Sequence, residues 1–235
     1  MAIHHLKLKA KENIANDTMA FHFEKPDGFE YKAGQFGEFY EINPKETDDE
    51  GTNRPFSIAS APFEQDLIIA SRMRDTAFKR NLKNMSVGDE IKLDGPYGSF
   101  TLHKDTTRPA VFLTGGIGIT PARSIIKEWN KEKLEHQVFL FYSNHTPTDA
   151  AFLEEFGQIE KENPNFKLIA IMTQDPTWEG EKERITKEML EKYVQNLELS
   201  IFYLSGPGNM VSGLNETLIN SGINEDNIRF EEFPY

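Results

Sequence analysis

Residues 110–121 read AVFLTGGIGITP, and this stretch decides how the fold of the chain is interpreted. An uninterrupted apolar run is typical of a buried strand. Gly115, Gly116 and Gly118 then allow the backbone to turn tightly and to approach a ligand. Thr120 is a good helix N-cap, and Pro121 stands where proline is favoured, at the first helical position. The amides and positive dipole end of such a helix suit a phosphate, although a turn that binds nothing would have the same pattern.

A second glycine-rich turn follows a later apolar strand, at residues 204–210 (LSGPGNM). In open α/β sheets the carboxyl ends of the strands flank one crevice, so we expect a single extended ligand to contact both turns. Ser143, which follows another apolar strand, is expected at the same edge. The residues of the second turn that we assign to this site are Ser205, Gly206, Pro207 and Met210.

The second half of the chain alternates apolar strands with amphipathic helices. We expect strands at residues 110–114, 138–142, 168–173 and 201–204, and helices at 121–133, 150–162, 186–195 and 209–221. Continuously hydrophobic strands separated by helices are typical of a parallel sheet covered on both faces. The predicted fold of this half is therefore an α/β domain with a parallel sheet.

The first half has a different period, with short, partly alternating strands separated by turns. We expect strands at residues 2–10, 19–25, 37–42, 56–59, 67–73 and 90–93, and one short helix at 76–85. Many short strands within a hundred residues indicate a small antiparallel barrel or sandwich. A polar linker at 103–108 leads us to divide the chain into residues 1–105 and 106–235.

Composition excludes several classes of function. The chain of 235 residues has a net charge of −12, which argues against nucleic-acid binding, and no apolar run reaches the length of a membrane span. It contains no cysteine, which excludes disulfides, thiolate metal sites and cysteine-bound iron–sulfur clusters within it. We expect a cytoplasmic protein without a functional metal, monomeric or dimeric.

A candidate phosphate and ring-binding segment lies at residues 53–58, NRPFSI, in the first half. Arg54 can bind a phosphate through two hydrogen bonds, Phe56 offers a flat apolar face and Ser57 a hydroxyl. Thr76, preceded by Arg72 and Arg74, begins the short helix and provides a second helix N-terminus for a phosphate. An exposed, ion-paired arginine followed by a buried phenylalanine is the alternative interpretation.

Taken in order, these motifs resemble the ferredoxin–NADP⁺ reductase family of flavoproteins. Residues 34–36 (GQF), 54–57 (RPFS), 95–100 (GPYGSF), 115–121 and 205–210 follow the order of the family's motifs over nearly the whole chain. The resemblance implies an N-terminal antiparallel β-barrel that binds flavin, followed by a C-terminal α/β parallel-sheet domain that binds NAD(P).

The resemblance also implies a role for each matching residue. The flavin would be held by Arg54, Pro55, Phe56, Ser57, Arg72, Arg74 and Thr76, and the nucleotide by Gly115, Gly116, Gly118, Thr120, Pro121, Ser143, Gly206, Pro207 and Met210. Ser57 and Ser205 would lie at the reacting rings. Tyr235 would cover the flavin, unless it is only a frayed chain end. Glu232 or its neighbour Glu231 would bind the nicotinamide amide or relay protons, unless the two are a solvated acidic pair.

The sequence departs from the family pattern at three positions. Phe56 stands where tyrosine is usual, and Ser205 stands where cysteine is usual. His145, where a basic residue would select the 2′-phosphate, leaves NADH and NADPH open as hydride donors. FAD is expected rather than FMN, because most of the family binds it.

The implied function is a flavoprotein oxidoreductase that takes hydride from NADH or NADPH and passes electrons to an external acceptor. The acceptor would be a small electron-carrier protein, such as ferredoxin or flavodoxin, or a small molecule such as free flavin. An electron-transfer subunit of a larger redox complex is the main alternative, and a nucleotide-binding regulatory module is another. Residues Arg72, Arg74, Lys79, Arg80 and Lys83 are predicted to form a basic docking surface for an acidic carrier.

Overall fold

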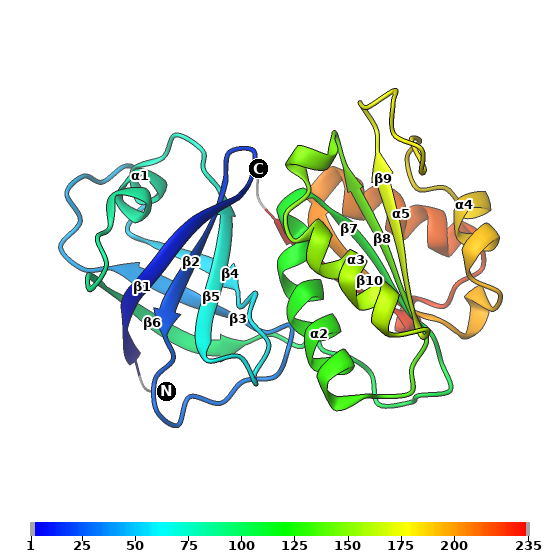
Figure 1. The fold of residues 1–235 in the computed structure, drawn as a ribbon, viewed down its shortest axis with the longest axis horizontal. Coiled ribbons are helices and arrows are strands. Elements are labelled where there is room, and N and C mark those ends of the chain that lie inside the picture. The colour runs from blue at the N-terminus through cyan, green and yellow to red at the C-terminus, as the bar shows by residue number, and fades with distance from the viewer. Residues whose placement is uncertain (1–2, 234–235) are drawn as a thin grey trace.

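Two sheets of opposite type make up the computed structural model, which describes residues 3–233 (Figure 1). In the first sheet every strand pair is antiparallel, and the strand order is β4-β3-β6-β1-β2-β5. Its elements are β1 (Ile3–Ala15), β2 (Thr18–Glu24), β3 (Phe36–Glu41), β4 (Asn53–Ser57), β5 (Asp66–Arg72), α1 (Ala77–Asn84) and β6 (Glu90–Tyr97). These agree with the predicted strands and helix, apart from Ala2, which lies outside the described residues.

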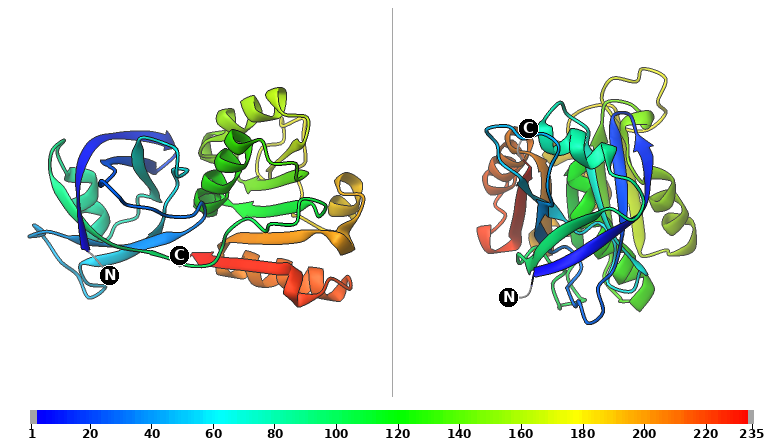
Figure 2. Two further views of the ribbon diagram at one scale, coloured as in Figure 1. Left: turned by 90° about the horizontal axis from the view of Figure 1, so that it is seen from below. Right: turned by 90° about the vertical axis from the view of Figure 1, so that its left-hand side faces the viewer.

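Buried and exposed side chains alternate along the strands of this sheet, and the buried ones meet in one core. In β1, Leu6 and Leu8 are fully buried while Lys7 between them and the residues from Lys9 to Asn13 are exposed, as expected for a strand with one face on a core. The two edge strands approach each other just beyond β4, where the amide of Ala59 donates to the carbonyl of Ile68 at 2.8 Å. The predicted antiparallel barrel is confirmed, and Figure 2 shows how strongly the sheet curls.

The second sheet is parallel throughout, with the order β11-β10-β7-β8-β9. Its elements are β7 (Ala110–Gly115), α2 (Ile119–Glu132), β8 (Val138–Asn144), α3 (Leu153–Glu162), β9 (Phe166–Met172), α4 (Lys187–Tyr193), β10 (Ile201–Pro207), α5 (Gly208–Asn220) and β11 (Ile228–Phe233). Strand β11 was not predicted, because a half-exposed edge strand with two adjacent glutamates lacks the apolar run of its neighbours.

Helices cover both faces of this sheet, as the apolar strands predict. Phe112 packs with Trp129 of α2 in one core, while Val111, next to it in β7, packs with Leu214 of α5 in another. Adjacent residues of β7 therefore pack in two different cores, one on each face of the sheet, and for this reason the strand has no polar residue before Thr114. Among residues 3–233 no helix is both long and apolar enough to span a membrane.

The start of α2 differs from the prediction. Gly116–Gly118 forms a 3₁₀ turn that runs directly into α2, so Gly118, and not Thr120, is the N-cap. Thr120 is the second helical residue, and its hydroxyl donates to the carbonyl of Ile117 at 3.1 Å. The glycine-rich turn is itself helical, which moves the helix start earlier and leaves Pro121 within the first turn.

The connection between the two sheets is fixed to β10 by a buried cluster. The amide of His103 donates to the hydroxyl of Tyr203 at 2.8 Å, and the Nε2 of His136 lies 3.0 Å from the carbonyl of His103. Burial lowers the pKa of His103 to about 4, so its ring is neutral at physiological pH. The linker predicted at residues 103–108 is therefore attached to the second sheet.

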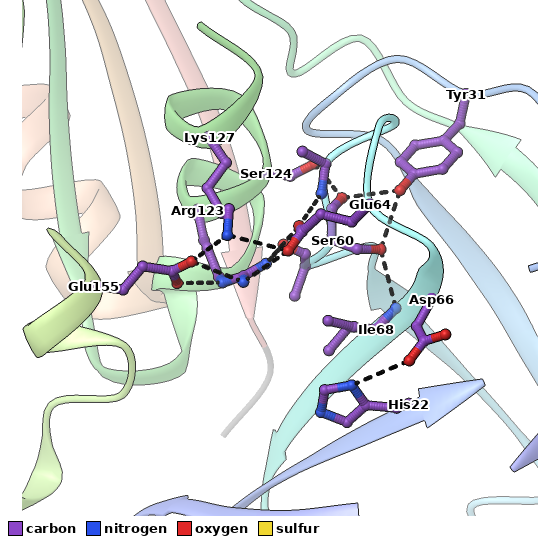
Figure 3. A network of polar contacts seen from close by, with 12 residues as sticks. His22, Tyr31, Ser60, Glu64, Asp66, Ile68, Arg123, Ser124, Lys127 and Glu155 are labelled. Atoms are coloured by element: carbon purple, nitrogen blue, oxygen red, sulfur yellow. Dashed lines mark hydrogen bonds and ion pairs between the residues drawn. The ribbon is translucent and has the colours of Figure 1, made fainter. Parts of the chain in front are cut away.

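A buried ion network joins α2 to the barrel (Figure 3). The Arg123 side chain is only 6% exposed and donates to Glu155 at 2.7 Å, to Glu64 at 3.0 Å and to the carbonyl of Ala59 at 2.7 Å. Lys127 lies between the same two carboxylates. Burial would raise the pKa of Glu64, but the hydrogen bond and charge of Arg123 outweigh it and lower that pKa. Two cations thus balance two carboxylates between the domains.

Removing Arg123 should leave two partly buried carboxylates with Lys127 alone. We expect Arg123→Ala to lower the free energy of unfolding by about 3–5 kcal/mol, measured by urea denaturation. Arg80→Ala breaks an exposed pair with Glu46 and should lower the free energy of unfolding far less, because water screens exposed charges. Equal losses in the two variants would contradict a special role for the buried network.

Candidate functional site

A cavity of about 760 Å³ opens at the carboxyl ends of β7, β8 and β10. Six of the residues assigned to the site from sequence line it: Arg72, Gly115, Gly116, Ser143, Pro207 and Met210. The strand register explains why these residues lie at one edge of the sheet, since Gly115 pairs with Ser143 on β8 and Thr114 pairs with Ser205 on β10. The prediction that both glycine-rich turns meet at one crevice is confirmed.

The two turns also pack directly on each other. A Cβ on Gly118 would lie 2.4 Å from the carbonyl oxygen of Ser205 and 2.6 Å from the backbone of Gly206. Gly118 and Gly206 do not line the cavity, and neither do Thr120 and Pro121. Glycine at position 118 is therefore required for contact between the turns, a reason that the sequence motif does not reveal.

The charged side chains that line the cavity are all cationic. Arg72, Lys182 and Arg184 line it, and its described lining residues include no Asp or Glu, although the chain carries a net charge of −12. Lys182 donates to the carbonyl of Pro176 at 2.7 Å and forms no salt bridge with a carboxylate within residues 3–233. Such a wall favours a ligand with several negative charges.

Several residues of the wall were not assigned from sequence. Thr173 and Gln174 follow β9 and could have been found by the rule that identified Ser143, because they too lie at the carboxyl end of a parallel strand. Lys182 and Arg184 belong to an irregular segment with no periodic pattern. Asn144 is buried at the same edge, and its side-chain amide has no hydrogen-bond partner among residues 3–233.

A second group of residues meets where the barrel faces the ends of β10 and β11. The hydroxyl of Ser57, on β4, donates to Glu231 on β11 at 3.3 Å. Glu231 pairs in register with Ser205, whose fully buried hydroxyl has no partner among residues 3–233. Burial raises the pKa of Glu231 to about 7, against the opposing effect of the Ser57 hydrogen bond. A polar contact thus joins the two domains, and the buried Ser205 lies on the strand next to it.

Glu231, and not Glu232, contacts Ser57. Glu232 is exposed and its carboxylate approaches Gly208 at the start of α5, because adjacent side chains of a strand point to opposite faces. Tyr235, expected over the flavin, lies outside the described residues. Figure 2 shows β11 running toward the barrel.

The segment around Arg54 is positioned by the barrel. Phe56 is only 9% exposed, and its ring packs against Phe39 and Phe78 with centroids 5.6 and 5.9 Å away. Pro55, next to it, is exposed, while the Arg54 guanidinium lies 5.3 Å from the centre of the Phe78 ring. The expected stacking of Phe56 on a flavin stays a prediction, since most of its surface is used by the core.

The N-terminus of α1 is capped as predicted, because the Thr76 side chain accepts from the amide of Lys79. The predicted basic docking surface nearby stays a prediction, and several of its cations have partners within the chain. Arg80 is paired with Glu46 and Asp75, and Arg72 faces the cavity. Three of its five members are thus engaged, since Lys79 also donates to the carbonyl of Arg72 at 2.8 Å.

Comparison with known proteins agrees with this arrangement. Residues 5–102 match an oxidoreductase FAD-binding domain, and residues 112–216 match an oxidoreductase NAD-binding domain. The chain is 29% identical to the reductase component of propane 2-monooxygenase from Rhodococcus jostii, over 89% of this chain and 57% of that protein. It is 28% identical to a subunit of the Na(+)-translocating NADH-quinone reductase of Serratia proteamaculans, over 94% of this chain and 58% of that protein.

Solved structures share the fold at low sequence identity. A flavohemoglobin from Malassezia yamatoensis with bound FAD and heme has a TM-score of 0.83 at 23% identity, covering 100% of this chain and 61% of that chain. A ferredoxin NADP⁺ reductase from Neisseria gonorrhoeae with bound FAD and NADP has a TM-score of 0.82 at 21% identity, covering 98% of each chain.

Fold and site together define a two-domain flavoprotein with FAD and a nicotinamide dinucleotide as its cofactors. The chain belongs to the ferredoxin–NADP⁺ reductase-like family, as its motifs indicated. It spans less than two thirds of the length of the curated relatives named above.

The raised pKa of Glu231 predicts a dependence of stability on pH. Above pH 7 the native protein must hold a buried carboxylate, a cost that Glu231→Gln removes, whereas below pH 4.5 both proteins are neutral at this position. We therefore expect the variant to gain on the order of 1–3 kcal/mol over the wild type as the pH rises from 4.5 to 7 and above. Urea denaturation across this range measures the gain, and a difference that stays constant with pH would contradict it.

Proposed function

We propose that this chain is an NAD(P)H-dependent flavin reductase that passes electrons from FAD to a separate acceptor. One observation carries the proposal: Ser57 of the FAD-binding domain donates to Glu231 of the parallel sheet, and Ser205, the register partner of Glu231, lies on β10, whose last residue Pro207 lines the cavity. A polar site shared by the two domains is what a reaction between two bound cofactors requires.

The residues present suit both cofactors. The cavity wall has three cations and no carboxylate for a dinucleotide diphosphate, and Gly115 and Gly116 expose backbone there. On the barrel side, Arg54 and the N-terminus of α1, with Thr76 as its cap, would hold the flavin phosphates. Of the remaining residues assigned from sequence, Pro55 and Phe56 position Arg54 and Ser57, and Tyr235 would cover the flavin ring.

The chemistry belongs to the cofactors, since bound FAD accepts hydride from a reduced nicotinamide and passes electrons on. The protein positions the two cofactors and supplies polar groups near them. Ser57 and Glu231 form a hydrogen bond between the domains, and the buried, unpartnered hydroxyl of Ser205 lies on the neighbouring strand. With a pKa of about 7, Glu231 can hold or release a proton at neutral pH, so we assign the proton relay to Glu231 and not to Glu232.

The acceptor lies outside these 235 residues, which contain no cysteine to bind an iron–sulfur cluster. A small carrier protein or a small molecule such as free flavin fits this proposal. One observation favours the alternative of a subunit in a larger redox complex: the curated relatives are a reductase component and a reductase subunit, and the chain covers 57% and 58% of their lengths. We also propose a domain boundary at residues 105–106 and a cytoplasmic location, where reduced nicotinamide nucleotides are found.

Anaerobic reduction tests the proposed function. Purified protein with FAD should be yellow and should bleach when NADH or NADPH is added, and a screen of acceptors should then restore the colour. Arg54→Ala should lose FAD on dialysis, because a charge-assisted phosphate contact is removed. A protein that takes up neither FAD nor FMN would refute the proposal, and retention of FAD by the variant would refute the role of Arg54.

The cationic wall of the cavity leads us to propose NADPH as the preferred donor, since its 2′-phosphate adds negative charge. Arg184→Ala should raise the KM for NADPH about tenfold and change the KM for NADH much less. Lys187→Ala, at an exposed pair with Glu191, is the matched control. An equal loss with both nucleotides would assign Arg184 to the diphosphate that they share.

A further inference from the structure

An acidic segment, residues 45–51 (KETDDEG), lies across the N-terminus of α1. Oδ2 of Asp48 accepts from the amide of Ala77, the first residue of the helix, at 2.7 Å. Oε2 of Glu50 accepts from Arg54 at 2.8 Å, and Glu46 accepts two hydrogen bonds from Arg80 at 2.9 and 2.6 Å. Three carboxylates of one segment therefore bind the cations and the amide around this helix end.

The contacts of Arg54 are extensive. Besides the Glu50 carboxylate, its guanidinium donates to the carbonyls of Glu50 and Asn53, both at 2.7 Å, and lies 3.7 Å from the carboxylate of Asp48. Arg54 and the first amide of α1 are the two groups to which we assign the flavin phosphates. The acidic segment thus binds the same two groups, and a phosphate must exchange with its carboxylates to reach them.

Electrostatics explains why anions collect here. Burial, followed by repulsion from Arg74 and Arg54, lowers the pKa of Lys79 to about 8, while Glu50 acts in the opposite direction. These cationic side chains lie together around the N-terminus of α1, where they repel one another unless anions lie among them. The carboxylates of the segment supply this negative charge, and a flavin phosphate supplies it equally well.

The ends of the segment are suited to movement. Asn43 and Gly51 have φ angles of +50° and +81°, the left-handed region that marks turns. A Cβ at Gly51 would meet no atom nearer than Asn53 Oδ1 at 3.9 Å, so no packing fixes this end. Asp48 and Glu50 are themselves exposed, so the segment is held over α1 by charge and hydrogen bonds and not by a buried apolar side chain.

We propose that residues 45–51 are an internal anion that competes with the flavin phosphates, so that flavin is an exchangeable ligand whose affinity this segment sets. The inference rests on the proposed flavin site and concerns its regulation. It predicts that removing the charges of Asp48 and Glu50 strengthens the binding of phosphate-bearing flavins. It also predicts no effect on riboflavin, which has the same ring and no phosphate.

The double variant Asp48→Asn, Glu50→Gln tests the proposal, because amides keep an acceptor oxygen and lose the charge. Flavin-free protein is titrated with FAD, FMN and riboflavin, and flavin fluorescence measures the Kd. We expect the Kd of FAD and FMN to fall about tenfold and that of riboflavin to stay unchanged. Asp27→Asn, Glu135→Gln is the matched control, since it removes two exposed charges outside the segment and should leave all three values unchanged.

Each other outcome has a definite meaning. FAD binding that is no tighter than in the control, or is weaker, would overturn the inference, and weaker binding would show that the carboxylates position Arg54 for the phosphates. Equal tightening of riboflavin would also overturn it, because the phosphates would then not be involved. If no flavin binds to any of the three proteins, the proposed flavin function itself fails, which distinguishes that failure from failure of the competition alone.

Discussion

The buried guanidinium of Arg123 is the interaction on which the arrangement of the two domains depends. It is 6% exposed, and it links α2 to Glu64 and the Ala59 carbonyl of the barrel and to Glu155 of α3 (Figure 3). A charge taken out of water must keep its partners, so the barrel cannot rotate away from α2 without leaving ions unpaired in the interior. The domain interface is therefore defined by polar geometry as well as by apolar contact.

The functional site is a consequence of this constraint. α2 begins in the glycine-rich turn that follows β7, so fixing α2 against the barrel also fixes the carboxyl edge of the parallel sheet. Ser57 then lies 3.3 Å from Glu231, on a strand that neighbours the nucleotide turns. Two cofactors that react need their reactive atoms held close together, and a rigid interface supplies that position without any reacting side chain.

Charge is distributed unevenly within this acidic protein. The cavity at the sheet edge is lined by cations without carboxylates, while the cations around α1 are matched by carboxylates of residues 45–51. The two proposed anion sites therefore differ: a phosphate would enter the first without displacing a carboxylate, whereas it would displace carboxylates at the second. This difference suits a nucleotide that binds and dissociates at the first site, and a flavin whose affinity is adjusted at the second.

The sequence by itself determined the two domain types and the edge where the nucleotide turns meet, because strand period and glycine-rich turns are local properties. Tertiary structure decided which residues of separate segments come into contact, because a local sequence pattern carries no information on such contacts. Lys182 and Arg184 come from an irregular segment, Gly118 is needed for contact with Ser205, and Glu231 is selected over Glu232 by the face of an edge strand. Glu46, which binds Arg80 of the predicted basic surface, is likewise 34 residues distant in sequence and meets it only in the folded chain.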